Sequence, residues 1–396
     1  MSKVRLTTIT PVHIGSGNVL YNNIDFVQGN VDGYPYLGVV DHQKLMKIIG
    51  PERVDSWVAA IERGSGFAEF VGKCSSKELT IEDYSSRLVY CPQVLRMAEN
   101  EPMREYIHDG MGKAYIPGSS LKGAIRTALL SHLVAEKNID VNLKLNLEKK
   151  TKTQAKPIEE ELFGKDPNSD SFRFLQIGDV YFDNDNEYVY NMININERER
   201  QSYVDKSKHQ LVEAIFDEDE SRIFSMKMSM TPELSKMIDE YNQRVYDWNH
   251  NPINAGKRPK NAIKKFAVSD MAALFSIINE HTKLLLEQEI EDWGDEIEED
   301  GVRDYLGAIR NVLREISRCK SCECVLRVGH ASGWRFTTGA WTEALNDDKW
   351  EALKNIARPG NQQKYYGMRF PKSRRVNYQR GEEMALMGFV KLSIVE

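Results

Sequence analysis

Cysteine is scarce in this chain, with five among 396 residues, and a small odd number does not suit a disulfide framework. The first residues lack the basic segment, apolar run and small-residue cleavage site of a secretory signal. No apolar stretch reaches the roughly 20 residues that a membrane-spanning helix needs. These absences predict a cytoplasmic protein with no membrane partner. The hydrophobic share of 41% suffices for one large core or two smaller ones.

A basic excess is also missing, since the formal net charge is -6, which is unusual for a nucleic-acid-binding protein. This net value conceals a strong segregation of basic and acidic residues along the chain. The stretch from Arg358 to Arg380 holds seven basic residues and no acidic one, which predicts a cationic surface. The stretch from Glu287 to Asp300 holds nine acidic residues and no basic one, which is typical of a solvated helix end or loop. Solubility alone is the competing interpretation of both runs.

Strands and helices are both expected, so the fold class is α+β. Period-two alternation predicts strands at residues 3–14, 34–40, 88–95, 172–182, 188–195, 322–328 and 387–395. Helical spacing predicts helices from Asp41, as N-cap, to about Ser86, and at residues 118–136, 231–250, 260–293 and 302–318. We expect residues 172–182 to pair with residues 188–195, and the first and last strands to share a sheet. Residues 144–156 are expected to form an exposed or disordered loop.

The strongest local signal is Tyr115–Leu130, where a Pro-Gly turn opens a helix. Ser119 or Ser120 is suited to cap it, which leaves free amide groups in front of Gly118. A buried apolar stripe is expected from Leu121, Ile125, Ala128 and Leu129, while Lys122 and Arg126 are four residues apart and share one helix face. Gly123 leaves that surface bare. The segment predicts a phosphate site at a helix N-terminus, and an ordinary capped helix with solvated cations is the alternative.

A second signal, residues 326–339, follows a strand, and we call it the glycine loop. Its glycines allow backbone amides to approach a sugar-phosphate chain. Arg327 and Arg335 are expected beside that chain, and Trp334 is suited to stack on a base. The spacing does not match G-x-G-x-x-G, and no G-x-x-x-x-G-K-[ST] occurs in the sequence. Dinucleotide and P-loop sites are therefore not predicted.

Three segments resemble the signature segments of the RAMP superfamily of CRISPR-associated proteins, in the expected order: Thr10–Gly17, Ile116–Arg126 and residues 329–338. Phe370–Arg375 and Met387–Leu392 are similar to the closing segments of the subunit family that caps the guide RNA in type III-A (Csm) effector complexes. The helical insertion at about 41–87 favours that family over the repeated subunit that cuts target RNA. A type III-B or III-D relative stays open, because the motifs are shared across the superfamily.

The resemblance implies an RRM-like ferredoxin core of the RAMP type with large helical insertions. The least patterned region of the sequence, near 140–155, suggests a division into residues 1–140, with an insertion at about 41–87, and residues 141–396, with an insertion at about 231–318 and closing strands. The resemblance further implies a non-catalytic, RNA-binding subunit on the 3′-end side of the guide, which supports guide maturation and antiviral defence. The expected partners are CRISPR guide RNA and other RAMP subunits, with host nucleases that trim the guide as a further candidate. No cofactor is implied.

The expected RNA-binding residues combine both signals with the resemblance. They are His13, Gly15, Ser16, Gly17, Gly118, Ser119, Ser120, Lys122, Gly123, Arg126, Arg327, Gly329, His330, Ser332, Gly333, Trp334, Arg335, Lys372, Arg374 and Arg375.

The sequence favours neither catalysis nor metal binding. A metal-independent guide-processing endoribonuclease would use His13 as general acid or base, but the sequence supplies no second proton-transfer group beside it. Asp25 corresponds in pattern to a metal-binding residue of slicing subunits, and a lone carboxylate is a poor metal site. Cys322 and Cys324 alternate with strand residues, which predicts buried thiols rather than zinc ligands.

Overall fold

The computed structural model describes residues 2–63, 67–92, 97, 101–144, 155–196, 203–217, 220–250, 261–294, 299–357, 371–378 and 384–395. The strands are β1 (Ser2–Thr8), β2 (Gly15–Tyr21), β3 (Phe26–Val31), β4 (Tyr34–Val40), β5 (Ser85–Tyr90), β6 (Pro102–Tyr106), β7 (Tyr115–Ile116), β8 (Leu175–Ile177), β9 (Val180–Tyr181), β10 (Glu187–Asn196), β11 (Val204–Ile215), β12 (Arg222–Met228), β13 (Glu323–Arg327), β14 (Ser373–Asn377) and β15 (Phe389–Val395). The helices are α1 (His42–Ile49), α2 (Val54–Glu62), α3 (Phe67–Lys73), α4 (Gly118–Glu136), α5 (Val141–Lys144), α6 (Lys156–Leu162), α7 (Pro232–His250), α8 (Met271–Trp293), α9 (Asp300–Ser317) and α10 (Asp347–Ala357).

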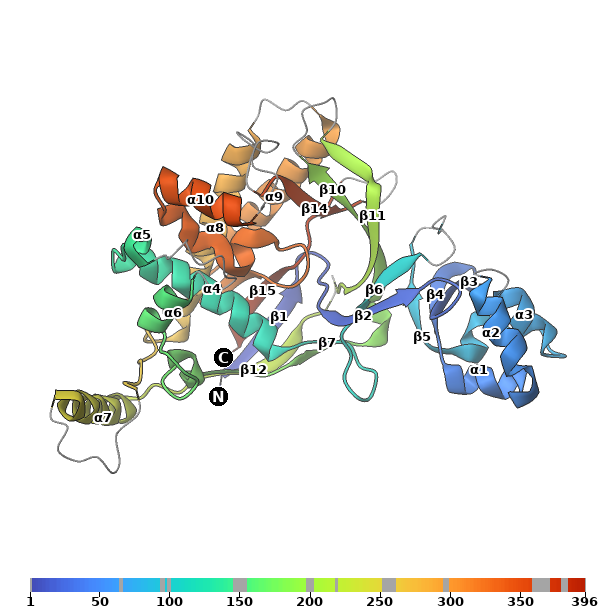
Figure 1. The fold of residues 1–396 in the computed structure, drawn as a ribbon, viewed down its shortest axis with the longest axis horizontal. Coiled ribbons are helices and arrows are strands. Elements are labelled where there is room, and N and C mark those ends of the chain that lie inside the picture. Colours follow the sequence, from blue (N-terminus) through green and yellow to red (C-terminus); the bar gives the residue numbers. More distant parts are fainter. Residues whose placement is uncertain are drawn as a thin grey trace.

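The first sheet has five strands in the order β13-β15-β1-β12-β8, and it lies within the larger body of the molecule (Figure 1). β1 is antiparallel to both β12 and β15, so the first and last strands share a sheet, as predicted. Alternate β1 residues, Val4 and Leu6, enter a core that α4 completes with Leu121 and Ile125. The predicted apolar stripe of this helix is therefore confirmed.

The second sheet has the order β2-β6-β11-β10-β5-β4-β3, with β14 paired to β10. The pairing predicted between residues 172–182 and 188–195 is wrong. β8 pairs with β12, β9 with β7, and β10 with β11. Alternation specifies which face of a strand is buried but not its partner, and here the partners come from distant segments. Both sheets also take strands from either side of residue 140, the boundary proposed from the sequence.

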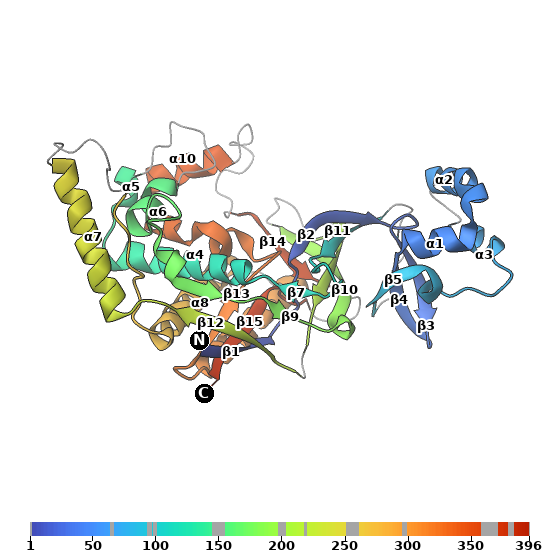
Figure 2. The same ribbon diagram turned by 90° about the horizontal axis from the view of Figure 1, so that it is seen from below.

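The described part of residues 26–90 forms a projecting unit, which we call the arm (Figures 1 and 2). It contains β3, β4 and β5 and the predicted helical insertion, here α1, α2 and α3. Leu45, Ile49 and Phe67 belong to a core of its own. The ladder between β5 and the body consists of one pair, Tyr90 with Tyr188. The arm is thus joined to the body by few backbone contacts.

Several local predictions are confirmed. Asp41 caps α1, because its Oδ1 accepts hydrogen bonds from the amides of Gln43 and Lys44 at 2.8 and 3.1 Å. α7, α8 and α9 lie at the predicted places, although α8 begins only at Met271. Most of the predicted loop 144–156 and residues 358–370 of the basic run lie outside the described residues. Within the described chain, no helix has both the length and the apolar character needed to cross a bilayer.

Candidate nucleic-acid interface

Two signature segments and one closing segment meet through their backbones. The amide of Gly388 donates to the carbonyl of Pro11 at 2.8 Å, and the amide of His330 donates to the carbonyl of His13 at 2.8 Å. Gly329 has a φ of +79°, and a Cβ there would lie 2.3 Å from the His13 carbonyl oxygen. Only glycine permits so close an approach at that φ. Residues 10–17, the glycine loop and residues 387–392 therefore converge in space.

Beside this junction lies a group that we call the basic cluster: His13, His330, Arg375 and Arg104. The imidazole rings of His13 and His330 meet edge to face, with their centroids 5.5 Å apart. Arg375 Nη1 lies 3.2 Å from His330 Nε2. Arg104 is exposed on β6, close enough to act electrostatically on the other three. Among the described residues, no carboxylate forms an ion pair with either arginine.

Burial keeps both histidines neutral at physiological pH. It lowers the pKa of His13 to about 4, with Arg104 lowering it further against a hydrogen bond to the Glu213 carbonyl that raises it. Burial also lowers the pKa of His330 to about 3, helped by His13, Arg375 and Arg104. The pKa of Arg375 is lowered by burial and by Arg104. The positive charge of the cluster is therefore carried by the two arginines.

This chemistry predicts an acid-sensitive fold. The unfolded chain takes up protons at the two histidines below about pH 6.5, whereas the folded chain does so only near pH 4 and below. The folded pKa values lie below the unfolded ones, so the unfolded state binds more protons in this window, and stability falls as the pH falls from 6.5 to 4. We expect urea unfolding to show this loss between pH 7 and pH 4.5, and His13→Gln to make it smaller. The exposed His42→Gln should leave it unchanged, and an equal effect of both substitutions would contradict the assignment.

Arg104 was not among the residues selected from the sequence. It lies in a strand with no motif around it, and only the pairing of β6 with β2 and β11 carries it to the junction. Two guanidinium groups without a carboxylate partner, beside close-packed backbone, suit phosphate oxygens. A neutral imidazole can add an N–H donor to such a site.

Three of the predicted RNA-binding arginines are buried: Arg327 and Arg335 of the glycine loop, and Arg374 of β14. Arg374 holds Glu289 through Nε and Nη2, both at 2.7 Å. Arg335 contacts Asp292 at 2.7 Å and Glu343 at 3.0 Å. A buried guanidinium needs such compensation, so Arg335 and Arg374 are engaged with carboxylates of this chain, although both border the cavity at the glycine loop together with Arg327. The acidic run is likewise not wholly solvated, because Glu289 is buried.

The rest of the glycine loop encloses part of a cavity of about 450 Å³. Ser332 is buried and donates to the Gly329 carbonyl at 2.7 Å. Gly333, with a φ of +81°, is exposed at the tip. Trp334 stacks on Trp350 with ring centroids 5.8 Å apart, so one of its faces is not open to a base. Lys372 is partly buried at the start of β14.

The α4 segment departs from the predicted phosphate cradle. Pro117 occupies the N-cap position, with no side-chain cap from Ser119 or Ser120. The amide of Gly118 donates to Asp179 Oδ1 at 2.7 Å, so a carboxylate of this chain stands where an anion was expected. The reason is tertiary, because Asp179 lies between β8 and β9. A Cβ on Gly118 would also lie 2.2 Å from the Ile177 carbonyl oxygen.

Lys122 and Arg126 share a face of α4, as predicted, but they differ in pairing. Arg126 forms ion pairs with Asp170 at 2.9 Å and Glu159 at 3.3 Å and lies over the Phe163 ring. Lys122 borders a cleft of about 600 Å³ together with Gly123, and burial lowers its pKa. Lys122 is therefore the cation of this pair that remains available to a ligand.

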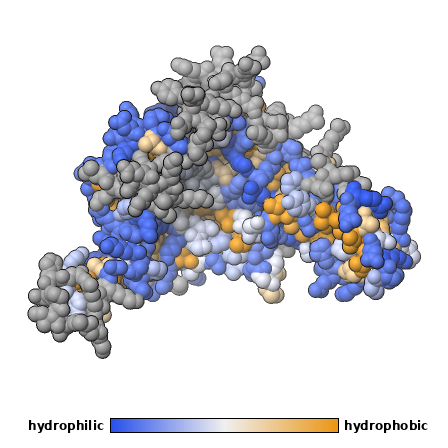
Figure 3. Space-filling model, in the orientation of Figure 1, coloured by the Kyte–Doolittle hydropathy of each residue, from blue (hydrophilic) through white to orange (hydrophobic). Residues whose placement is uncertain are grey.

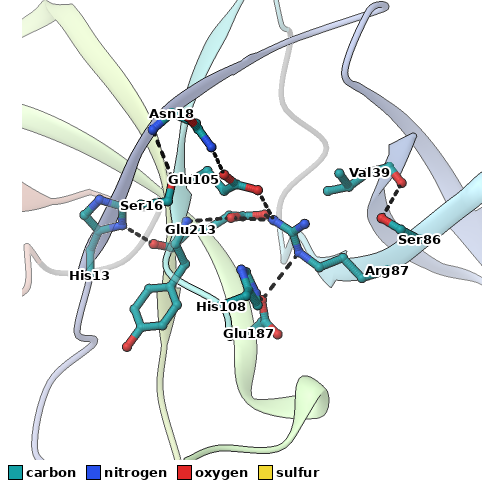
Figure 4. A network of polar contacts seen from close by, with 11 residues as sticks. His13, Ser16, Asn18, Val39, Ser86, Arg87, Glu105, His108, Glu187 and Glu213 are labelled. Carbon is teal, nitrogen blue, oxygen red and sulfur yellow. Dashed lines mark hydrogen bonds and ion pairs between the residues drawn. The ribbon is translucent and has the colours of Figure 1, made fainter. Parts of the chain in front are cut away.

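A polar network links the basic cluster to the arm (Figure 4). His13 contacts the backbone carbonyl of Glu213, and the Glu213 carboxylate binds Arg87 of β5 at 2.6 and 2.8 Å. Glu105 and Glu187 also point toward this guanidinium, at 3.5 and 3.8 Å. Ser16 and Asn18 of β2 donate to Glu105 at 2.9 Å. The network ties the start of β2 to the base of the arm.

The other candidates have local roles. Asp25 Oδ2 accepts a hydrogen bond from the Tyr21 amide at 2.9 Å, which closes a turn. Cys324 is buried in β13 and Cys322 partly so, in agreement with strand thiols. No group of three or more His, Cys, Asp or Glu residues in the described part of the chain is arranged to hold a metal ion.

Comparisons with known proteins point in one direction. The model of the RAMP superfamily matches residues 5–336. The Csm5 protein of Streptococcus thermophilus, described as a CRISPR system Cms protein, is 29% identical over 136 residues, which cover 33% of this chain and 38% of that protein. The Csm5 protein of Enterococcus italicus is 24% identical over 149 residues, covering 32% and 42%. These alignments span less than half of either relative.

Two solved structures share the fold over nearly the whole chain. One is a chain of a Csm-crRNA-target RNA ternary complex from a type III-A CRISPR-Cas system, with a TM-score of 0.69, 19% identity and complete coverage of both chains. The other is Csm5 of T. onnurineus, with a TM-score of 0.59, 18% identity, and coverage of 98% of this chain and 99% of that one. The predicted α+β fold of the RAMP type is confirmed.

Proposed function

Because this chain belongs to the RAMP superfamily, we propose that it is a CRISPR RNA-binding subunit of a type III-A (Csm) ribonucleoprotein complex. It caps the stack of subunits on the 3′-end side of the guide RNA in the cytoplasm, and it supports guide maturation and antiviral defence. The observation that carries the proposal is the basic cluster. Arg104 and Arg375 have no carboxylate partner among the described residues, at the place where the signature segments meet.

The recognition is of the RNA backbone rather than of its bases. The two guanidinium groups bind phosphate oxygens, and the neutral imidazole of His330 lies beside them. Gly15, Gly17 and Gly333 have no side chains, so the RNA strand can come close to the protein backbone there. Lys122 adds a phosphate contact at the α4 cleft. Such contacts position an RNA strand without reading its sequence.

The test replaces both arginines by alanine. We expect Arg104→Ala with Arg375→Ala to weaken binding of a labelled single-stranded RNA at least tenfold, whatever its sequence. The slope of log affinity against log salt should fall by about 1.4, because each phosphate contact on a single strand contributes about 0.7. Fluorescence anisotropy titrations at several salt concentrations measure both quantities.

Arg244→Ala is the matched control, because this exposed arginine lies on α7, a helix that Figure 1 shows far from β6 and β14. It should change neither affinity nor slope by a comparable amount. A double variant that binds as tightly as the parent, with the same slope, would exclude the cluster as the RNA site.

The alternative is a metal-independent endoribonuclease that uses His13. Its imidazole is buried, its Nδ1 is held by a backbone carbonyl, and its low pKa leaves it without a proton to give at neutral pH. These features support a structural role, in which the subunit cuts no RNA itself and host nucleases trim the guide. Cleavage of labelled repeat RNA by the purified chain, abolished by His13→Ala, would overturn this part of the proposal.

A further inference from the structure

The first sheet has one face that α4 does not cover. In Figure 2, α4, α6 and α10 lie on one side of β12, β1 and β15. Lys3 and Arg5 of β1 and Lys227 of β12 have the opposite parity to the core residues and are exposed. Ile223 pairs directly with Arg5 and is 58% exposed. The open face therefore combines cations with an apolar centre.

The charges on this face are unbalanced. Lys3, Arg5 and Lys227 form no ion pair with any described carboxylate. Lys3 pairs with Ser225, so Lys227 is its diagonal neighbour on the same face, and like charges at such distances repel. The described part of the face does contain a carboxylate, Glu323, but this group already forms an ion pair with Lys391 at 3.2 Å. An acidic partner would relieve this repulsion.

A groove of about 450 Å³ adjoins the face where β1 ends. Ile9, Val312 and Leu386 line it together with Arg314, Glu315 and Arg318 of the α9 end. Glu315 pairs with Arg318 at 2.7 Å, which leaves Arg314 as the groove cation without an ion pair to any described carboxylate. Glu323 connects the open face to the region of the groove. Its carboxylate accepts a hydrogen bond from the amide of Lys320 at 3.0 Å, just beyond the end of α9. The face and the groove thus form one surface, which we call the basic face.

We infer that the basic face docks an acidic segment with apolar side chains from a neighbouring protein subunit. This inference rests on the proposed function for the setting of a multi-subunit complex. The groove and Ile223 suit apolar side chains, and the cations around them suit carboxylates, as in a protein interface with an apolar centre and a polar rim. A single RNA strand fits less well, because stacking needs aromatic side chains. The outward residues of this face are Lys3, Arg5, Thr7, Gln176, Ile223, Ser225, Lys227, Glu323, Lys391 and Ser393.

Figure 3 shows a second apolar region, near β2 and the base of the arm, where Val19 and Tyr21 are exposed. It lacks the charge pattern of the basic face, and nothing in the structure indicates its occupant.

Charge reversal tests the inference. The Csm complex is assembled with its guide RNA from the source cell's own subunits, another subunit carries the purification tag, and the amount of this chain retained is measured. We expect Lys3→Glu with Arg5→Glu to reduce retention at least tenfold, while the purified variant binds single-stranded RNA like the parent. Lys236→Glu with Arg244→Glu on α7 is the matched control and should be retained normally.

Two results would overturn the inference. Normal retention of the Lys3/Arg5 variant would exclude the face as a subunit contact. Loss of RNA affinity in that variant, with its circular dichroism and unfolding midpoint unchanged, would make the face an RNA surface instead. Failure of the proposed function would give a different result, because the parent chain itself would then neither bind RNA nor be retained in the complex.

Zero-length carbodiimide cross-linking adds a chemical readout, since it joins ammonium groups to carboxylates in contact. In the parent complex, we expect mass spectrometry to find Lys3 or Lys227 linked to Asp or Glu of a different subunit. Links from these lysines only to a second copy of this chain, or no links to another subunit, would reject the proposed partner.

Discussion

Replacing Glu289 by glutamine is expected to lower the free energy of unfolding by about 3–5 kcal/mol, the usual cost of breaking a buried ion pair. Burial alone would raise the pKa of Glu289, but Arg374, its hydrogen bonds and Arg335 lower it below the usual range. The carboxylate also accepts the Tyr305 hydroxyl at 2.9 Å. Glutamine has nearly the same shape but no charge, so Arg374 would stay buried without its counter-ion.

Urea unfolding at pH 7 measures the loss. Glu287→Gln is the matched control, since this exposed glutamate of α8 pairs only loosely with Lys283, at 3.8 Å, and should cost no more than about 1 kcal/mol. The stabilising contribution of Glu289 should itself fade as the pH falls below about 4.3, because its folded pKa is the lower one. Equal losses from the two substitutions would show that the ion pair does not support the glycine loop.

Arg87→Met is expected to have an effect of similar size at pH 7, about 3–5 kcal/mol. Its guanidinium is the cation shared by Glu105, Glu187 and Glu213, and Glu213 is fully buried. Burial already raises the pKa of Glu213 while Arg87 opposes that rise. Without Arg87 the folded pKa of Glu213 should move further above the unfolded value, so the folded state binds the extra proton. The difference in stability between the parent and the variant should therefore shrink as the pH falls from 7 to 5.

Hydrogen exchange should show where this loss falls. We expect β5 and the helices of the arm to exchange faster in Arg87→Met, since the ladder between β5 and β10 is a single pair. Arg63→Met, an exposed change on the same arm, serves as the control. Uniform acceleration over the whole chain would argue that the network stabilises the fold globally rather than the arm.

Local features of the fold could be predicted from the sequence. Asp41 was identified as an N-cap, and Leu121 and Ile125 as a buried stripe, because each depends on neighbours within a few residues. The signature segments also converge, since the glycine at 329 has the φ and the bare Cα that close packing requires.

The start of α4 could not be predicted in the same way. The residue that satisfies the amide of Gly118 is Asp179, 61 positions along the chain. Arg335 and Arg374 resembled surface cations, since Glu289 and Asp292, which pair with them, belong to α8. Arg104 has no local signal at all. Each error concerns a side chain whose partner only the tertiary fold supplies.

The place of β1 in the first sheet has a consequence for biosynthesis. Val4 pairs with Phe224 on one side and Ile394 on the other, 220 and 390 positions further along. When Val4 leaves the ribosome, neither partner strand has been synthesised. Both edges of β1 therefore remain unpaired while most of the polypeptide is translated. Contacts so distant in sequence form slowly, and unpaired strands invite aggregation. The nascent polypeptide should therefore depend on chaperones for longer than its size alone would demand.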